Sequence, residues 1–517
     1  MSSLVRLSQS DLWERQRQYY HKSGVEAWNS GTVPHYVTNN PVIANAYADF
    51  IAAHIDDLAQ AGELDLEKPV HVVEMGGGSG RLAFLILRRL EALDKVLPVK
   101  VRYVLTDFTT TNLGHWREHP SFASLFAEGR LDLAQFDVEN DTSLHLEVSG
   151  ETIDPSGNPV FFVANYLFDS LTQDCFNVEN GVLNEAIPKI TYQDGTSHMV
   201  AEVEYSFHAA GGTPYGRPDY DEILEQYRAR LGHTSFLFPV GPLKCLQALS
   251  QISGGRMCLV TADKAWSRWE DLVGVGDPLP VPHGDCFSLT VNFHAMGLWW
   301  EGQGGRALHT APRDSVLQIS CFLMGLPEER WPRTMRVFEE KIDGSGPLDF
   351  FLFREALSTS TGHKSFRYCL EMMRLSNWDP EVLFELSEPL SEVKTEDLST
   401  LNKRELFMAL ARTWANYFFI GETRDIPFEV ARILFRLEYY DQSLTFYEES
   451  LRSFGTHKMT HFNMGLCHYY LRRLDRAKES FEKSLELDAG YGVARDWLLR
   501  LRPEIEESGT FPAVSLS

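Results

Sequence analysis

A run of glycines within the first hundred residues is the segment whose composition points most directly to chemistry. Glu74-Met75-Gly76-Gly77-Gly78-Ser79-Gly80 follows a short Val-rich run, residues 69–75, and precedes residues 81–93, whose apolar side chains recur at helical spacing. This order predicts a strand, a tight turn and a helix. Glycine tolerates positive φ and has no side chain, so the backbone N–H groups of such a turn can approach a ligand at the helix N-terminus. We therefore expect the turn to bind an anionic or polar group.

Two familiar glycine motifs do not match this turn. A dinucleotide-binding turn needs G-x-G-x-x-G, and counting from Gly76 places Arg81 at the third glycine position. The phosphate loop of nucleotide triphosphatases needs Gly-Lys-Ser/Thr, which is also missing. The segment instead resembles E-x-G-x-G-x-G, the first motif of class I S-adenosyl-L-methionine-dependent methyltransferases.

The resemblance implies a set of cofactor-binding residues after three successive strands. The glycine turn would receive the amino-acid end of S-adenosyl-L-methionine. Asp107 follows the predicted strand at residues 99–105 and the single Thr after it, and would accept hydrogen bonds from the ribose hydroxyls. Asp137 would accept a hydrogen bond from the adenine amino group. Phe108 or Phe136 would form an apolar wall. The implied cofactor site is thus Glu74, Met75, Gly76, Gly77, Gly78, Gly80, Asp107, Phe108, Phe136 and Asp137. The structural alternative is that Asp107 and Asp137 only cap strands or turns.

A second segment narrows the resemblance. Residues 163–170, VANYLFDS, are similar to the N-E-x-x-D-A segment of the MidA-like methyltransferases, which include the mitochondrial complex I assembly enzyme that acts on a protein arginine. Residues 287–293 and 318–325 resemble two later segments of that family. By this resemblance Asn165, Tyr166 and Asp169 are the catalytic candidates: Asn165 and Asp169 would position the acceptor, with Tyr166 as a hydrogen-bonding or cation-contacting wall. The alternative for Asp169 is a helix cap.

The chain departs from the MidA-like pattern at three positions that matter for arginine chemistry. Tyr166 stands where the family has Glu, and Thr290 and Asn292 stand where it has His and Asp. Carboxylates orient a guanidinium and make its nitrogen more nucleophilic, so these changes bear on whether arginine methylation is retained.

The fold class expected for the first domain, residues 1–330, is α/β with a Rossmann-like class I methyltransferase sheet. Val-rich or apolar runs at 69–75, 99–105, 131–136, 160–164 and 256–261 alternate with helix-length segments, which is typical of parallel β-α-β units. Around Glu179-Asn180-Gly181 the pattern indicates a β-hairpin, so we expect an inserted hairpin and helical substrate region at about residues 171–255.

An all-α second domain is expected after a linker at residues 331–347, where Pro and Gly are frequent. Ala431 and Gly465 are 34 positions apart, the tetratricopeptide period, and Tyr447 and Phe481 are in register with them. We expect a tetratricopeptide-like domain at 348–505 and a flexible tail at 506–517. The alternative is an unrelated helical bundle.

Composition limits the partners. Lys plus Arg number 48 and Asp plus Glu 72, a net charge of −24, which disfavours nucleic acid and anionic membranes. No run reaches the ~18 apolar residues of a membrane span, and the N-terminal residues lack a secretory apolar core, so a cytoplasmic location without membrane insertion is expected. The seven cysteines and the histidines lack metal-ligand spacing, so no metal is expected.

The function predicted from these features is S-adenosyl-L-methionine-dependent methylation of a protein or peptide, with arginine N-methylation as one form. The helical repeats would select the partner, because tetratricopeptide surfaces are concave grooves for peptides. Two alternatives stay open: a non-catalytic, methyltransferase-like assembly or adaptor protein, and a small-molecule methyltransferase whose repeats serve oligomerisation. A homo-oligomer is also left open.

Overall fold

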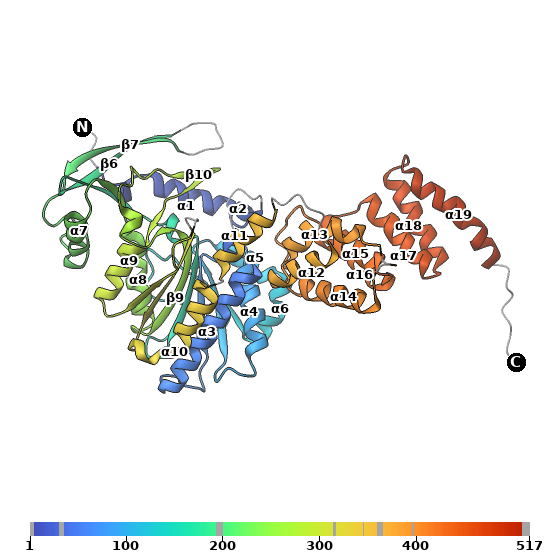
Figure 1. Ribbon diagram of the computed structural model, residues 1–517, viewed down its shortest axis with the longest axis horizontal. Coiled ribbons are helices and arrows are strands. Elements are labelled where there is room, and N and C mark those ends of the chain that lie inside the picture. The colour runs from blue at the N-terminus through green and yellow to red at the C-terminus, as the bar shows by residue number, and fades with distance from the viewer. Residues whose placement is uncertain are drawn as a thin grey trace. The chain divides into compact units, whose positions relative to one another are not determined.

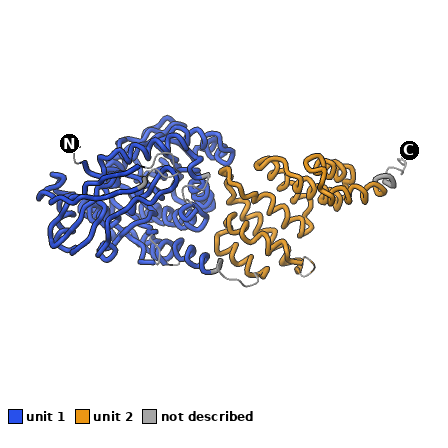
Figure 2. Tube along the Cα trace, turned by 90° about the horizontal axis from the view of Figure 1, so that it is seen from above, with its two compact units in different colours: residues 1–359 blue, residues 360–517 orange. Residues whose placement is uncertain are grey.

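The computed structural model describes residues 5–29, 36–192, 200–313, 317–344, 346–358, 365–394, 396 and 398–508. The chain forms two compact units, Met1–Thr359 and Ser360–Ser517, which are coloured separately in Figure 2. Each is described by itself.

The first unit is built on a mixed sheet in the order β13-β14-β9-β4-β1-β2-β3, with β12 paired to β9. Strands β1, β2, β3, β4 and β9 run parallel, whereas β14 is antiparallel to β9 and to β13. The strands are β1 (Val70–Met75), β2 (Val101–Asp107), β3 (Leu131–Gln135), β4 (Val160–Asn165), β9 (Met257–Trp266), β12 (Val291–Asn292), β13 (Arg306–His309) and β14 (Leu317–Met324). The predicted α/β fold with a parallel sheet, as in a class I methyltransferase, is confirmed.

Helices cover both faces of this sheet (Figure 1). Neighbouring residues of β4 show why: Phe161 contacts His54 of one helix layer at a ring distance of 5.1 Å, whereas Phe162 belongs to the apolar cluster that contains Leu246 and Trp300 of the other. Strands buried on both faces read as continuous apolar runs, which is the pattern the sequence displays. The helices of this unit are α1 (Leu12–Ser23), α2 (Glu26–Asn29), α3 (Pro41–Ala61), α4 (Arg81–Leu93), α5 (Thr110–Glu118), α6 (Ala123–Ala127), α7 (Pro218–Arg230), α8 (Val240–Ile252), α9 (Phe293–Gly302), α10 (Pro332–Val337) and α11 (Pro347–Ser358).

The segment between β4 and β9 contains a separate four-stranded antiparallel sheet in the order β7-β6-β5-β8. Its strands are β5 (Asp174–Glu179), β6 (Val182–Tyr192), β7 (Val200–Ala209) and β8 (Thr234–Phe238), and α7 lies between β7 and β8. The expected hairpin is present: Asn180 and Gly181 connect β5 to β6 with φ of 51° and 76°, the two positive values of a tight hairpin turn. A short two-stranded sheet pairs β10 (Val281–His283) with β11 (Cys286–Ser288).

The boundary of the first unit differs from the linker expected at residues 331–347. Helix α10, the π-helical turn η7 (Phe338–Asp343) and α11 all pack against α3. The Phe338 ring lies 6.4 Å from that of Phe50, and the buried Asp57 carboxylate accepts from the Thr334 N–H and hydroxyl, both at 2.8 Å. The prolines and glycines in this stretch therefore lie at bends between packed helices and do not form a linker.

The second unit is all helical, with α12 (Phe366–Leu375), α13 (Pro380–Glu392), α14 (Thr400–Ala415), α15 (Ile426–Arg436), α16 (Tyr440–Phe454), α17 (Lys458–Tyr470), α18 (Leu474–Leu487) and α19 (Gly492–Ser508). The pairs α15–α16 and α17–α18 correspond to the two copies of the 34-residue pattern, and Ala431, Tyr447, Ala477 and Phe481 are all buried. Helix α19 includes residues 506–508 of the expected tail, and residues 509–517 lie outside the described residues. Within the described part of the chain, no helix is both long and apolar enough to span a bilayer.

Gly465 is the position at which the α17–α18 pair should be most sensitive to substitution. A Cβ atom there would lie 2.5 Å from the Phe481 ring, which is fully buried and cannot yield. We expect Gly465→Ala to destabilise this helix pair by about 1 to 3 kcal/mol. Hydrogen exchange followed by mass spectrometry on the full chain should show faster exchange in α17 and α18. Gly492→Ala, where a Cβ meets nothing within 4 Å, is the control and should leave exchange unchanged.

Candidate functional site

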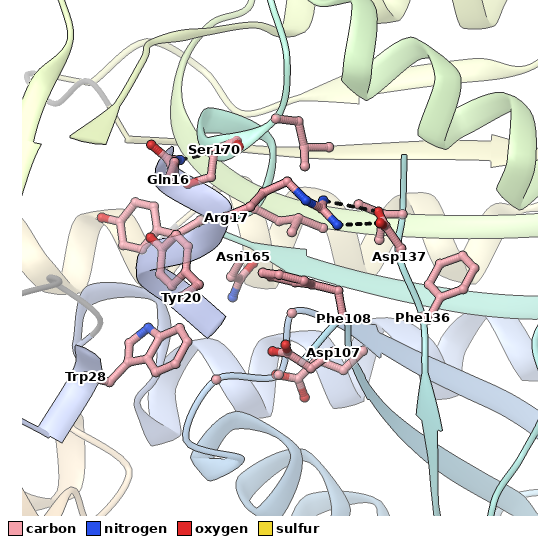
Figure 3. A pocket seen from close by; sticks show the side chains of 18 of the residues that line it. Gln16, Arg17, Tyr20, Trp28, Asp107, Phe108, Phe136, Asp137, Asn165 and Ser170 are labelled. Atoms are coloured by element: carbon pink, nitrogen blue, oxygen red, sulfur yellow. Dashed lines mark hydrogen bonds and ion pairs between the residues drawn. The ribbon is translucent and has the colours of Figure 1, made fainter. Parts of the chain in front are cut away.

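A large cavity opens at the carboxyl ends of β1, β2, β3 and β4. The strand order reverses here, because the chain leaves β1 for β2 on one side and later returns to β4 on the other. Ligands of open α/β sheets bind at such a switch point. Figure 3 shows the cavity, whose lining includes Trp13, Gln16, Arg17, Tyr20, Trp28, Asn39, Glu74, Gly76, Gly77, Gly78, Ser79, Asp107, Phe108, Phe136, Asp137, Asn165, Tyr166 and Ser170.

The glycine turn forms the floor of the cavity and needs its glycines for two different reasons. Gly76, Gly78 and Gly80 have φ of 62°, 53° and 82°, values that L-residues with side chains rarely adopt. Gly77 has ordinary φ, but a Cβ atom there would lie 2.5 Å from Leu105 and 3.0 Å from Trp116. The neighbours of the turn therefore hold its shape, and its three glycines in the lining present only backbone to the cavity. Gly80 is the N-cap of α4.

Glu74 is a buried acid just before this turn. Its side chain accepts a hydrogen bond of 2.7 Å from the Tyr103 hydroxyl on β2, and Met75 beside it is fully buried. Burial raises the pKa of Glu74 to about 8, with the Tyr103 hydrogen bond opposing the shift. Glu74 is consequently neutral at pH 7 in this state.

Asp107, at the end of β2, lines the cavity but already has partners within the chain. One carboxylate oxygen accepts from the Thr109 N–H and hydroxyl, both at 2.8 Å, and the other accepts from Asn112 at 2.9 Å. A carboxylate offers about four acceptor positions, so Asp107 retains one for a ligand. Burial raises the pKa of Asp107, although these hydrogen bonds oppose the shift.

Asp137 follows β3 and is bound by a residue far away in the sequence. Arg17 of α1 donates to both of its oxygens, at 2.5 and 3.4 Å, as Figure 3 shows, and Asn140 donates at 2.8 Å. Burial alone would raise the pKa of Asp137, but the hydrogen bonds from Arg17 and Asn140 hold it below its ordinary value. The Arg17 guanidinium also lies 4.7 Å from the centre of the Phe108 ring, whereas Phe136 is buried in the core beside the cavity.

Helix α1 supplies a wall of the cavity that was not predicted from the sequence. Trp13, Gln16, Arg17 and Tyr20 all line it, and Trp28 of α2 contacts the glycine turn, since a Cβ on Gly78 would lie 3.2 Å from its ring. Gln16 is 2% exposed, its amide N–H reaches the Ser170 carbonyl at 3.4 Å, and its Oε1 has no partner among the described residues. The one-turn spacing of these four residues is the pattern that could have indicated a helix face over a site.

Of the three catalytic candidates, Asn165 and Tyr166 line the large cavity and Asp169 does not. Asn165 lines the cavity, but its side-chain oxygen accepts from the Tyr47 hydroxyl and the Ala262 N–H, each at 3.0 Å, and its amide donates to the Thr38 carbonyl at 2.9 Å. Tyr166 also lines the cavity, with φ of 50°. Burial raises the pKa of the Tyr166 hydroxyl, which stays protonated.

Asp169 does not line the large cavity. It lines a smaller neighbouring cavity together with Tyr20, Tyr166 and Ser170. Asn292, at a family position for Asp, instead caps α9 by accepting from the Ala295 N–H at 2.9 Å, and neither it nor Thr290 lines either cavity. The described residues include no group of three or more His, Cys, Asp or Glu side chains arranged to hold a metal ion.

Comparison with known proteins supports the tetratricopeptide repeats of the second unit. The function of the first unit has to be argued from its own residues. Residues 459–491 match the tetratricopeptide repeat family, which places α17 and α18 in that class of helix pair. No curated protein matches the chain.

Among solved structures, the chain is similar to a Burkholderia thailandensis protein bound to S-adenosyl-homocysteine, with 12% identity, a TM-score of 0.41, and coverage of 64% of this chain and 90% of that one. A second protein from B. thailandensis, which is uncharacterized, has 12% identity, a TM-score of 0.39 and the same coverage. An O-methyltransferase family protein from B. thailandensis has 9% identity, a TM-score of 0.29, and coverage of 63% and 68%. Likenesses this weak carry no argument about the site.

The raised pKa of Glu74 makes a prediction about stability. The folded protein binds this proton more tightly than the unfolded chain, so the stabilisation is complete below the ordinary pKa of 4.5 and is lost as the pH rises to about 8. Glu74→Gln is neutral throughout and can still accept from Tyr103. We expect the difference in unfolding free energy between pH 5 and pH 8 to be smaller in the variant by about 1 kcal/mol or more. Chemical denaturation at the two pH values measures it. Glu67→Gln, at an exposed position before β1, is the control, and equal pH dependence in Glu74→Gln and wild type would contradict the prediction.

Proposed function

We propose that the first unit is a methyltransferase that uses S-adenosyl-L-methionine. The observation that supports this most directly is the glycine turn at the switch point of the sheet, with Asp107 beside it at the end of the next strand. Backbone N–H groups at such a turn suit the carboxylate of an amino acid.

The residues present fit this cofactor. Gly76, Gly77 and Gly78 line the cavity without side chains, and Asp107 keeps one acceptor position for a ribose hydroxyl. Glu74 would pair with the cationic amino group once it ionises, and Phe108 and Phe136 would flank the adenine. The cofactor would supply an electrophilic methyl group, and the chain would bind and orient it.

We propose further that the tetratricopeptide unit recruits a protein or peptide acceptor, in line with the grooves that such repeats form. A non-catalytic adaptor is the second candidate. It is favoured by the ion pair between Arg17 and Asp137, which occupies the carboxylate expected to meet adenine, and by the full engagement of the Asn165 oxygen.

Titration calorimetry with S-adenosyl-L-methionine separates these candidates, and Gly77 provides the decisive variant. Its substitution by Ala forces a Cβ against Leu105 and Trp116, so the turn must move. We expect wild type to bind and Gly77→Ala to lose affinity by about tenfold or more, or about 1.4 kcal/mol.

Gly114→Ala, on α5 with open space around the new Cβ, is the matched control and should bind as wild type does. Circular dichroism on each variant checks that it is folded. Absence of heat from folded wild type would reject the enzyme, whereas unchanged affinity in Gly77→Ala would mean that the cofactor lies elsewhere.

The acceptor class is tested by incubating cell lysate with the full chain and methyl-labelled cofactor. Because we assign the repeats to partner recruitment, we expect label in a protein band. Gly77→Ala, which we expect to bind the cofactor more weakly, is the negative control for methyl transfer. Label confined to small metabolites would favour the small-molecule alternative over ours.

A further inference from the structure

The smaller cavity adjoins the large one, and the chemistry of its lining defines an acceptor. Tyr20, Tyr166 and Ser170 line both cavities, so a group in the smaller one lies next to a ligand in the larger one. The remaining lining residues are Asp169, Lys264, His283, Phe287 and Ser288. They come from η4 (Phe168–Ser170), β9, β10 and β11, elements distant in sequence that meet here.

Three aromatic rings surround the smaller cavity. Phe287 packs on Trp13 of α1 at a ring distance of 5.4 Å, and the Tyr20 hydroxyl points to Cys286, 3.7 Å from its sulfur. Tyr166 forms the remaining aromatic wall. Aromatic side chains prefer offset or edge contacts with another flat ring. The cavity has a volume of about 30 Å³, so it admits the hydroxyl end of an aromatic acceptor and not a whole ring.

One buried carboxyl group, that of Asp169, lines the smaller cavity, and a second, that of Asp263, lies next to it. Asp169 is 5% exposed and Asp263, on β9, is fully buried. The Asp169 N–H donates to the Asp263 carboxyl at 3.2 Å, and the Ser170 hydroxyl donates to the Asp169 carboxylate at 3.0 Å. Burial raises the pKa of both, that of Asp169 to about 6 and that of Asp263 further, because Asp169 adds its charge. Because the two buried carboxyl groups lie side by side, they do not both ionise, and the pair holds a proton.

Lys264 faces the same cavity and forms no ion pair with any residue that the structure describes. It is close enough to Asp169 to lower the pKa of that carboxyl. An ammonium group without a paired carboxylate repels a cationic acceptor such as a guanidinium and attracts an oxygen that gains negative charge. The Tyr166 hydroxyl stays protonated and adds no negative charge that would attract a guanidinium.

We propose that this cavity binds a phenolic hydroxyl group as the methyl acceptor, with Asp169 accepting its proton and Lys264 stabilising the oxygen. The proposal rests on the methyltransferase function proposed above. Two sources share this chemistry, a tyrosine side chain of a recruited protein and a free small phenol.

The transfer is balanced in atoms and charge. The O–H bond of the phenol breaks and its proton passes to the Asp169 carboxylate. The oxygen electron pair forms the new O–CH₃ bond, the S–CH₃ bond of the sulfonium breaks, and its electron pair stays on sulfur as a neutral thioether. A phenol suits Asp169 better than an aliphatic alcohol, because its ordinary pKa of about 10 is far closer to that of the base.

The test uses 4-nitrophenol, whose phenolate absorbs visible light, as the probe. The full chain is mixed with the probe and S-adenosyl-homocysteine, and absorbance is titrated with pH. The charged and titratable groups that line the cavity are Asp169 from η4, Lys264 from β9, His283 from β10, and Tyr20 and Tyr166, whereas Asp263 of β9 lies next to Asp169 and does not line it. We expect the bound probe to ionise at a higher pH in Lys264→Met than in wild type.

Lys244→Met, an exposed lysine that lines neither cavity, is the control and should titrate as wild type does. Methylguanidine competes with the probe weakly in wild type and at least tenfold better in Lys264→Met. Equal titration in Lys264→Met and wild type, or tighter binding of methylguanidine than of 4-nitrophenol by wild type, would overturn the proposal.

The role of Asp169 is tested in turnover. Asp169→Asn should lower kcat for methylation of 4-methylphenol, whose ordinary pKa of about 10 keeps it protonated near pH 7, at least a hundredfold while changing its affinity less than threefold, and an unchanged kcat would overturn the role of Asp169. Acid hydrolysis of a labelled protein band should release O-methyltyrosine if the source is a protein, whereas a labelled aryl methyl ether among metabolites indicates a free phenol. Methylarginine would overturn the proposal. Cofactor binding in calorimetry is independent of all these results, so it shows whether the acceptor site or the methyltransferase itself has failed.

Discussion

The requirement for glycine at positions 76, 77, 78 and 80 is the constraint on which the site depends. The side chains of Leu105 and Trp116 pack against Gly77, and that of Trp28 packs against Gly78. Phe122 lies 3.0 Å from where a Cβ of Gly80 would be. Each of these contacts comes from a different element. The turn is therefore both the most crowded part of the site and the part where only backbone groups remain to meet a ligand.

Local features of the sheet could be predicted because they depend on short-range pattern. Apolar runs of five to seven residues specified β1 to β4 within two residues, and residues 81–93 match α4 at both ends. The Asn180-Gly181 pair specified the hairpin, since both residues adopt positive φ. In the same way, the 34-residue spacing located α15 to α18, because each pair must bring small residues against aromatic ones.

The rest of the site depends on contacts between residues far apart in the chain, which leave no local pattern. Arg17 and Asp137 are 120 positions apart, so their ion pair could not be anticipated from either neighbourhood. Asp263 lies within an otherwise apolar strand and becomes relevant only because η4 docks on it. The π-helical turn after α10 shows the same limit: Pro and Gly suggested a linker, whereas Phe338 and Thr334 fasten the segment to α3.

The distribution of charge within the site agrees with a cationic ligand in a protein of net charge −24. Several acids in and beside the cavities are compensated within the chain: Glu74 by a proton, Asp107 by hydrogen bonds, Asp137 by Arg17, and the Asp169–Asp263 pair by the proton that it holds. Removing buried carboxylates from water is costly, so leaving several uncompensated would destabilise the fold. Because protons and hydrogen bonds are exchangeable partners, a sulfonium or an ammonium group entering the cavity can replace them. The buried acids then favour the cation without having destabilised the empty protein.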